Sequence, residues 1–196
     1  VISGNQHLLR VDEETEDFIL PQTEKKLLAF IHDMMEEKNM DTVVFQDYDK
    51  GVVTPSLINA VTENARKQGI PVLVDPKKRN FLRFKGVDLF KPNFKELNEG
   101  LKADIDKTDL EAIAGLMEEF RKMNVFSHIM VTLSEMGVMI NKDGEYHHVA
   151  AEVRDIADVS GAGDTVISLA ALCMGLGLDP VDLAGLSNLA GGQVCE

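Results

Sequence analysis

Cysteine, tryptophan and long apolar runs are scarce or missing from this sequence of 196 residues. Its two cysteines, Cys173 and Cys195, provide no disulfide framework, which favours a reducing cytoplasm. Cys173 lies within an apolar helical pattern, and we expect a buried free thiol there. No stretch reaches the roughly 18 apolar residues of a transmembrane helix, and no signal-peptide pattern stands at the start. We therefore expect a cytoplasmic protein without a membrane segment.

Positive charge is also scarce. The chain has 33 acidic and 20 basic residues, which gives a net charge of −13. Such a surface repels nucleic acids and anionic membranes, so we expect neither as a partner. An anionic substrate must then be held by local positive groups. The hydrophobic content of 44% suits one globular domain with a substantial core.

Several common catalytic motifs are missing as well. No Gly-Lys-Ser or Gly-Lys-Thr occurs, which excludes a Walker A loop, and no Gly-x-Gly-x-x-Gly follows a predicted strand. No serine sits in a nucleophile elbow. The adjacent His147 and His148 have no neighbours at zinc-ligand spacing and fit a solvated hairpin better.

Apolar strands alternate with amphipathic helices along the chain, which predicts an α/β fold with a mostly parallel central sheet. Thr54-Pro55 predicts the start of a helix that ends at Gly69, and Thr108 with Glu111 fits a capping box. The predicted strands, the last two of them a hairpin, cover residues 6–11, 42–46, 71–74, 87–90, 129–133, 138–141 and 146–149.

Polar clusters follow many of these strands. Ligands of such sheets bind beyond the carboxyl ends of the strands, so we expect the clusters to converge on one crevice. The five clusters are Asp47–Lys50, Asp75–Lys77, Asn93–Glu96, Thr132–Ser134 and Asp158–Asp164. Within them, Lys50 and Lys77 either bind a substrate phosphate or belong to the solvated surface.

The most informative segment is residues 158–165, Asp-Val-Ser-Gly-Ala-Gly-Asp-Thr. Gly161, Ala162 and Gly163 can bring backbone N–H groups onto an anion, and the predicted helix 162–176 points its positive end at the same place. Asp164 adds a carboxylate, and this combination suits phosphoryl transfer to a hydroxyl. The alternative is a glycine-rich turn that only caps a helix.

Asn93 and Glu96 lie three residues apart at a predicted helix start and share one face. An amide and a carboxylate in this arrangement can hold waters around Mg²⁺ and the phosphates of a nucleotide. The alternative is a helix cap with an acidic residue in the first turn.

These segments resemble the ribokinase-like, or PfkB, carbohydrate kinases. Residues 158–165 are similar to the second signature of that family, 92–96 to its Asn-x-x-Glu motif, and 131–137 to its nucleotide-side strand and turn. The matches run in the family's order and cover essentially the whole chain. The resemblance implies a three-layer α/β/α sandwich with a small β lid, formed by one kinase domain over residues 1–196. We expect that domain to be truncated at its N-terminus and shortly before its natural C-terminus, with the lid incomplete.

The resemblance also implies roles for individual residues. Asp164 would be the general base, and Gly161, Ala162 and Gly163 would form the anion hole. Residues that would organise Mg²⁺ and ATP, with Glu96 nearest the metal, are Asn93, Glu96, Thr132, Ser134, Gly137 and Asn188. Residues that would contact the sugar phosphate are Asp47, Lys50 and Lys77. Asp158 and Ser160 would hold a monovalent cation such as K⁺.

Within the family, residues 5–12, 47–51, 74–77 and 158–166 are most similar to kinases that phosphorylate C1 of D-glycero-β-D-manno-heptose 7-phosphate on the route to lipopolysaccharide. We therefore expect an ATP-dependent kinase for this sugar phosphate that forms a homodimer. The alternatives are a PfkB kinase for ribose, fructose phosphate or a nucleoside, and a regulator that binds sugar or nucleotide without catalysis.

Overall fold

The computed structural model describes residues 2–3, 6–7, 13–37, 40–151 and 161–194. Of the strand predicted at residues 6–11, only the first two residues fall within this part of the chain. The elements in chain order are β1 (Ile2–Ser3), β2 (Gln6–His7), α1 (Pro21–Glu36), β3 (Val43–Gln46), α2 (Pro55–Gln68), β4 (Val72–Asp75), β5 (Leu89–Phe90), α3 (Phe94–Leu101), α4 (Leu110–Asn124), β6 (His128–Thr132), the 3₁₀ helix η1 (Ser134–Met136), β7 (Val138–Lys142), β8 (Glu145–Val149), α5 (Ala162–Gly175) and α6 (Pro180–Val194).

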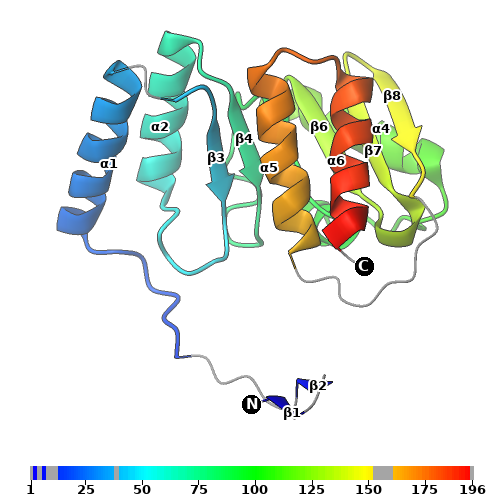
Figure 1. Cartoon of the computed structure of the whole chain (residues 1–196), viewed down its shortest axis with the longest axis horizontal. Helices are drawn as coiled ribbons and strands as arrows, with labels where there is room; N and C mark the ends of the chain where they lie inside the picture. The colour runs from blue at the N-terminus through cyan, green and yellow to red at the C-terminus, as the bar shows by residue number, and fades with distance from the viewer. Residues whose placement is uncertain (1, 4–5, 8–12, 38–39, 152–160, 195–196) are drawn as a thin grey trace.

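The central sheet has six strands in the order β3-β4-β5-β6-β7-β8 (Figure 1). β3 to β6 are parallel, and β7 and β8 add an antiparallel hairpin to one edge. The hairpin turns at Asp143 and Gly144, both with positive φ, as its Asp-Gly sequence predicts. β1 and β2 form a separate antiparallel pair. The predicted α/β fold with a mostly parallel sheet is confirmed.

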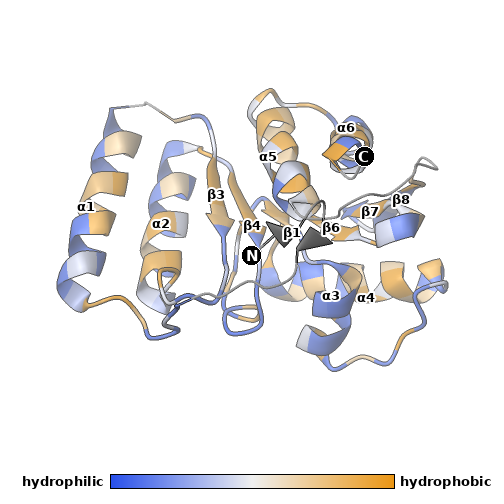
Figure 2. Ribbon diagram, turned by 60° about the horizontal axis from the view of Figure 1, so that its bottom comes forward, coloured by the Kyte–Doolittle hydropathy of each residue, from blue (hydrophilic) through white to orange (hydrophobic). Residues whose placement is uncertain are grey.

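Helices cover both faces of the sheet and produce three layers (Figure 2). Side chains of successive strand residues point to opposite faces. Val72 and Val74 therefore join the apolar cluster under α2, α3 and α4, while Leu73 joins the cluster under α5 and α6. The first cluster contains stacked and edge-on phenylalanine rings, including Phe90 and Phe126 at 4.8 Å between centroids. α1 packs on α2 at the edge of this layer.

Most helix boundaries follow from local sequence signals. The Thr54 hydroxyl accepts a hydrogen bond from the Leu57 N–H at 3.0 Å, and Gly69 ends α2 in the left-handed region at φ 70°. The Asp179 carboxylate likewise accepts from the Val181 N–H at 2.8 Å at the start of α6. The start of α2 at Thr54-Pro55 was expected from the sequence.

The predicted capping box at Thr108 and Glu111 is wrong. α4 begins one residue later, and the Asp109 carboxylate accepts from the Ala112 N–H at 3.0 Å. The Thr108 hydroxyl instead donates to the Asp106 carboxylate at 2.6 Å. The turn at residues 106–108 uses the Thr108 side chain, which the sequence pattern had assigned to the helix cap.

α5 and α6 approach each other closely at one glycine. A Cβ on Gly191 of α6 would lie 2.6 Å from Val166 Cγ2 and 3.6 Å from the Ala162 carbonyl oxygen of α5. Any larger residue would force either the Val166 side chain or one of the helices to shift. The buried core of α5 also contains Cys173, a free thiol as expected, and burial raises the pKa of that thiol.

Some apolar side chains remain on the surface near the β3 edge of the sheet. Within the described residues β3 pairs only with β4, and Val44 on it is exposed. Leu172 and Leu176 on the neighbouring α5 are more exposed still. None of the described helices combines the length and the apolar character that crossing a membrane requires.

Candidate active site

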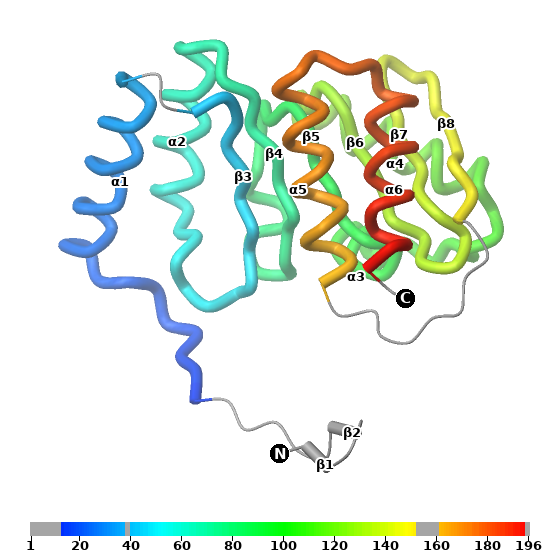
Figure 3. Tube along the Cα trace, viewed as in Figure 1, coloured from blue at the N-terminus to red at the C-terminus, as the bar shows by residue number. Residues whose placement is uncertain are grey.

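The carboxyl ends of β3 and β4 meet the amino end of α5 at one end of the sheet (Figure 3). The link between them is Gln46, the last residue of β3. Its side-chain amide donates to Asp164 Oδ1 at 2.9 Å and to Asp75 Oδ2 at 2.8 Å. Three elements that are far apart in the sequence are thereby joined through one side chain.

Asp164 lies on the first turn of α5, and its carboxylate is exposed to solvent. The Tyr48 hydroxyl lies 2.9 Å from Oδ1 and 2.8 Å from Oδ2 of this carboxylate. The hydrogen bond to Asp164, with a smaller contribution from burial, raises the pKa of Tyr48. Tyr48 therefore keeps its proton at neutral pH and acts as a donor to Asp164.

The backbone at the start of α5 suits an anion. Gly161 has φ 82°, in the left-handed region that favours glycine, and no side chain in the described part of the chain caps the helix. The first N–H groups of a helix lack partners within the helix and lie at its positive end. At Gly163 a Cβ would lie 3.9 Å from Lys91 Nζ and 4.0 Å from Asp75 Oδ2. The first turn of α5 therefore has N–H groups without partners in the helix, and it lies beside the charged side chains of Lys91 and Asp75.

A buried ion pair lies beneath this turn. Lys91 Nζ lies 3.2 Å from Asp75 Oδ1, and the two side chains are only 3% and 6% exposed. Lys91 follows β5 directly and Asp75 ends β4, so the pair joins two adjacent strand ends. Sequence reasoning missed both this role of Lys91 and the link through Gln46.

Asn93 and Glu96 form the capping box of α3. Asn93 Oδ1 accepts from the Glu96 N–H at 2.8 Å, and Glu96 Oε2 accepts from the Asn93 N–H at 2.9 Å. Lys77 forms an ion pair with the other oxygen, Glu96 Oε1. Burial alone would lower the pKa of Lys77, but the hydrogen bond and charge of Glu96 outweigh it, and the pKa is raised. Lys77 and Glu96 therefore form a charged pair at the strand ends.

The predicted nucleotide-side residues occupy the next strand ends. Thr132 forms a parallel bridge with Asn93, and Ser134 opens η1. Gly137 has φ 89°, and a Cβ there would lie 2.0 Å from the Val149 carbonyl oxygen, so the backbones meet directly. Asn188 of α6 donates to the Ala150 carbonyl oxygen at 2.9 Å. Gly137 and Asn188 thus both lie at the end of β8.

Two of the predicted substrate residues serve other contacts. Asp47 is buried, and its carboxylate accepts from the Asn80 amide and the Asp49 N–H, both at 2.9 Å. This carboxylate therefore supports the turn after β3. Lys50 forms an ion pair with Glu14. Of the predicted cation residues, Asp158 and Ser160 lie outside the described residues.

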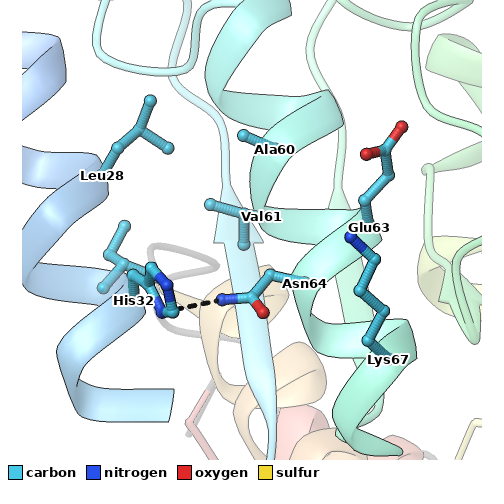
Figure 4. Close-up of a pocket in the computed structure, with 8 residues that line it drawn as sticks. Leu28, His32, Ala60, Val61, Glu63, Asn64 and Lys67 are labelled. Atoms are coloured by element: carbon cyan, nitrogen blue, oxygen red, sulfur yellow. Dashed lines mark hydrogen bonds between the residues drawn. The ribbon is translucent and has the colours of Figure 1, made fainter. Parts of the chain in front are cut away.

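A separate groove of about 320 Å³ lies between α1 and α2 (Figure 4). Its lining is partly apolar, with Leu28 and Val61, and the His32 ring faces the Asn64 amide at 3.5 Å. None of the predicted site residues lines this groove. The groove therefore shares no residue with the predicted site.

Comparisons with known proteins agree with this fold. The family described as "pfkB family carbohydrate kinase" matches residues 8–196 of this chain. The Bifunctional protein HldE of Geobacter metallireducens is 34% identical over 98% of this chain, and the match covers 39% of that protein. Escherichia coli phosphofructokinase-2 in its tetrameric inhibited form superposes with a TM-score of 0.77, at 16% identity over 91% of this chain and 58% of that one. Arabidopsis thaliana ribokinase complexed with ribose and ATP superposes with a TM-score of 0.67, at 18% identity over 91% and 54%.

The fold is therefore ribokinase-like, and the matched family is one of sugar kinases. The chain belongs to the pfkB family of carbohydrate kinases. It spans about two-fifths of the length of the curated relatives it matches.

Proposed function

We propose that this chain is the kinase domain of an enzyme that transfers the γ-phosphate of ATP to C1 of D-glycero-β-D-manno-heptose 7-phosphate. The observation that carries the proposal is the carboxylate of Asp164, which lies on the first turn of α5, exposed to solvent and held by the Gln46 amide. An oriented carboxylate beside a helix N-terminus combines a base with a site for the transferred phosphate.

In the proposed reaction Asp164 takes the proton of the sugar hydroxyl. The hydroxyl oxygen then attacks the γ-phosphorus, and the bond to ADP breaks. The N–H groups of Gly161, Ala162 and Gly163 stabilise the negative charge that builds up on the phosphoryl oxygens. Lys91 lies beneath this turn, and its partner Asp75 keeps that ammonium group in place.

Magnesium fits the residues that face the proposed nucleotide site. Among the described residues no three histidine, cysteine or acidic side chains form a metal cluster. Mg²⁺ bound to a nucleotide needs no such cluster, because phosphates and waters supply most of its ligands. Glu96, with its side chain 17% exposed, would hold these waters together with Asn93. When bound, the metal neutralises charge on the phosphates.

The choice of a heptose phosphate is supported by the relatives named HldE and by the segments at residues 47–51 and 74–77. Lys77 is the positive group of these segments that lies at the strand ends beside Glu96. We propose that it contacts the phosphate of the acceptor. The homodimer remains a prediction, which light scattering on the purified protein tests.

The decisive variant of the full-length protein is Asp164→Asn. The amide keeps the size of the side chain but cannot accept the proton, so we expect kcat to fall by about 10²- to 10⁴-fold while ATP still binds. ADP release with sugar and calorimetric titration with ATP measure the two quantities. Asp33→Asn, an exposed carboxylate on α1, is the matched control and should leave kcat unchanged. Near-normal turnover of Asp164→Asn would refute the assignment.

A substrate panel tests the finer proposal separately. The wild-type protein is assayed with ATP against ribose, fructose 6-phosphate, a nucleoside and heptose 7-phosphate. We expect the highest kcat/KM for heptose 7-phosphate. A preference for another sugar would remove the heptose proposal and leave the kinase class intact.

A further inference from the structure

Both oxygens of the Asp164 carboxylate are already engaged. Oδ1 accepts from the Gln46 amide and lies 2.9 Å from the Tyr48 hydroxyl, while Oδ2 lies 2.8 Å from the same hydroxyl. A hydroxyl or a water that gives its proton to Asp164 must approach one of these oxygens. Because the Tyr48 hydroxyl is nearly equidistant from the two oxygens, it bridges them, and a molecule that approaches the carboxylate between its oxygens competes with Tyr48.

The backbone that carries Tyr48 is well fixed. Asp49 and Gly51 adopt positive φ, at 57° and 78°, and the Asp47 carboxylate holds the Asp49 N–H. A Cβ on Gly51 would lie 1.8 Å from the Asp17 carbonyl oxygen, so the turn packs tightly against the preceding segment. Tyr48 itself is 53% exposed. Its ring can therefore swing away from Asp164 without movement of the turn.

We propose that Tyr48 is a gate that occupies the catalytic carboxylate until a sugar hydroxyl displaces it, and that this gate suppresses the hydrolysis of ATP by water. The inference rests on the proposed function, because it takes Asp164 as the base. In the suppressed reaction a water oxygen would bond to the γ-phosphorus, the bond to ADP would break, and the water proton would pass to Asp164. With Tyr48 in place, that proton meets a carboxylate whose oxygens are both engaged.

A sugar differs from water in how it can open this gate. A sugar phosphate bound through its other groups presents its hydroxyl at a high effective concentration, whereas a water has no further contacts to hold it there. The neutral phenol forms one shared hydrogen bond to a charged group, and loss of such a bond shifts an equilibrium by about tenfold or more. A gate of this strength discriminates against water and still yields to a positioned acceptor.

The test is Tyr48→Phe in the full-length protein, which keeps the ring and removes the hydroxyl. We expect ADP release with ATP alone to rise about tenfold over wild type, with kcat for the sugar changed less than about threefold. The matched control is Tyr146→Phe, because Tyr146 also donates to a carboxylate, Glu111, at 2.7 Å but lies on the β8 hairpin. This control should leave both rates unchanged. If Tyr48→Phe only damaged the structure, ATP hydrolysis and sugar phosphorylation would both fall, and hydrolysis would not rise.

Unchanged hydrolysis in Tyr48→Phe would overturn the gate, and so would a loss of hydrolysis and sugar transfer together. The exposed position of Tyr48 makes folding of the variant secure, and Tyr48→Ala should raise hydrolysis as well. Addition of Asp164→Asn to Tyr48→Phe should abolish the extra hydrolysis. If Asp164→Asn alone leaves sugar transfer intact, the proposed function fails; if it removes transfer while Tyr48→Phe leaves hydrolysis low, only the gate fails.

Discussion

The buried pair of Lys91 and Asp75 offers the sharpest test of how this site is held together. The substitution Lys91→Met keeps much of the side-chain volume and removes the charge. It leaves the Asp75 carboxylate 6% exposed, with the Gln46 amide at 2.8 Å as a donor that still compensates it. The charge on Asp75 then has to be desolvated without its partner.

The expected cost follows from this geometry. Breaking a buried ion pair from one side costs about 3–5 kcal/mol, and the remaining donor on Asp75 places this case near the lower end. A loss of about 3 kcal/mol changes the ratio of folded to unfolded protein by roughly two orders of magnitude. Domains are stable by about 5–15 kcal/mol, so the variant remains folded but is clearly weakened.

Urea unfolding followed by far-UV circular dichroism measures this loss, since the chain has no tryptophan. The double variant Lys91→Met with Asp75→Asn should cost less than the sum of the single variants, by about 2 kcal/mol. Lys95→Met is the matched control, because Lys95 is 81% exposed and 3.8 Å from Glu99, and should cost less than about 1 kcal/mol. A cost below about 1 kcal/mol for Lys91→Met, or additive single costs, would refute the reasoning.

Three further predictions concern helix ends and pH. Gly161→Ala should cost about 1–2 kcal/mol because of its φ of 82°, whereas Gly163→Ala, with 3.9 Å of room, should cost nothing; equal losses in urea would contradict this backbone argument. Asn93→Ala removes the capping box of α3 and should lower stability by about 1 kcal/mol in the same titration. The hydrogen bond from Arg121 lowers the pKa of Glu118 from 4.5 to about 2, so Glu118 stabilises the fold above pH 4.5 and progressively less as the pH falls towards 2. Glu118→Gln should therefore lower the free energy of unfolding by about 1–2 kcal/mol at pH 7, a figure already reduced for solvent screening. The loss should become smaller as the pH is lowered, and a loss that stays constant with pH would argue against the ion pair.

Much of the fold could be predicted from the sequence, because local signals and burial agree. Thr54-Pro55 and Gly69 bound α2 where expected, and the apolar run before Asp75 is a buried parallel strand. The failure at Thr108 has a local cause. Thr108 and Asp109 can both cap a helix, and only the preceding turn decides which side chain is taken.

The candidate site also contains some features that the sequence predicts and others that it does not. The glycines before Asp164 and the spacing of Asn93 and Glu96 are visible in the sequence, because backbone freedom and helix spacing are local properties. The partners of Asp164 are not, since Gln46 lies 118 residues away along the chain. Lys91 was missed because lysine is mostly exposed, and only its place directly after a buried strand hinted at its burial.

The close approach at Gly191 links α6 to the end of α5 that carries Asp164. Asp164 lies on the same turn as Ala162, which meets Gly191 across the helix seam. A methyl group added at Gly191 would clash with Val166 Cγ2, about half a turn beyond Asp164 on α5, and a shift of α5 that relieves this clash would also displace Asp164. In the proposed mechanism, turnover thus depends in part on a contact that no substrate touches, and variation at this helix contact would change turnover while every reacting group stays the same.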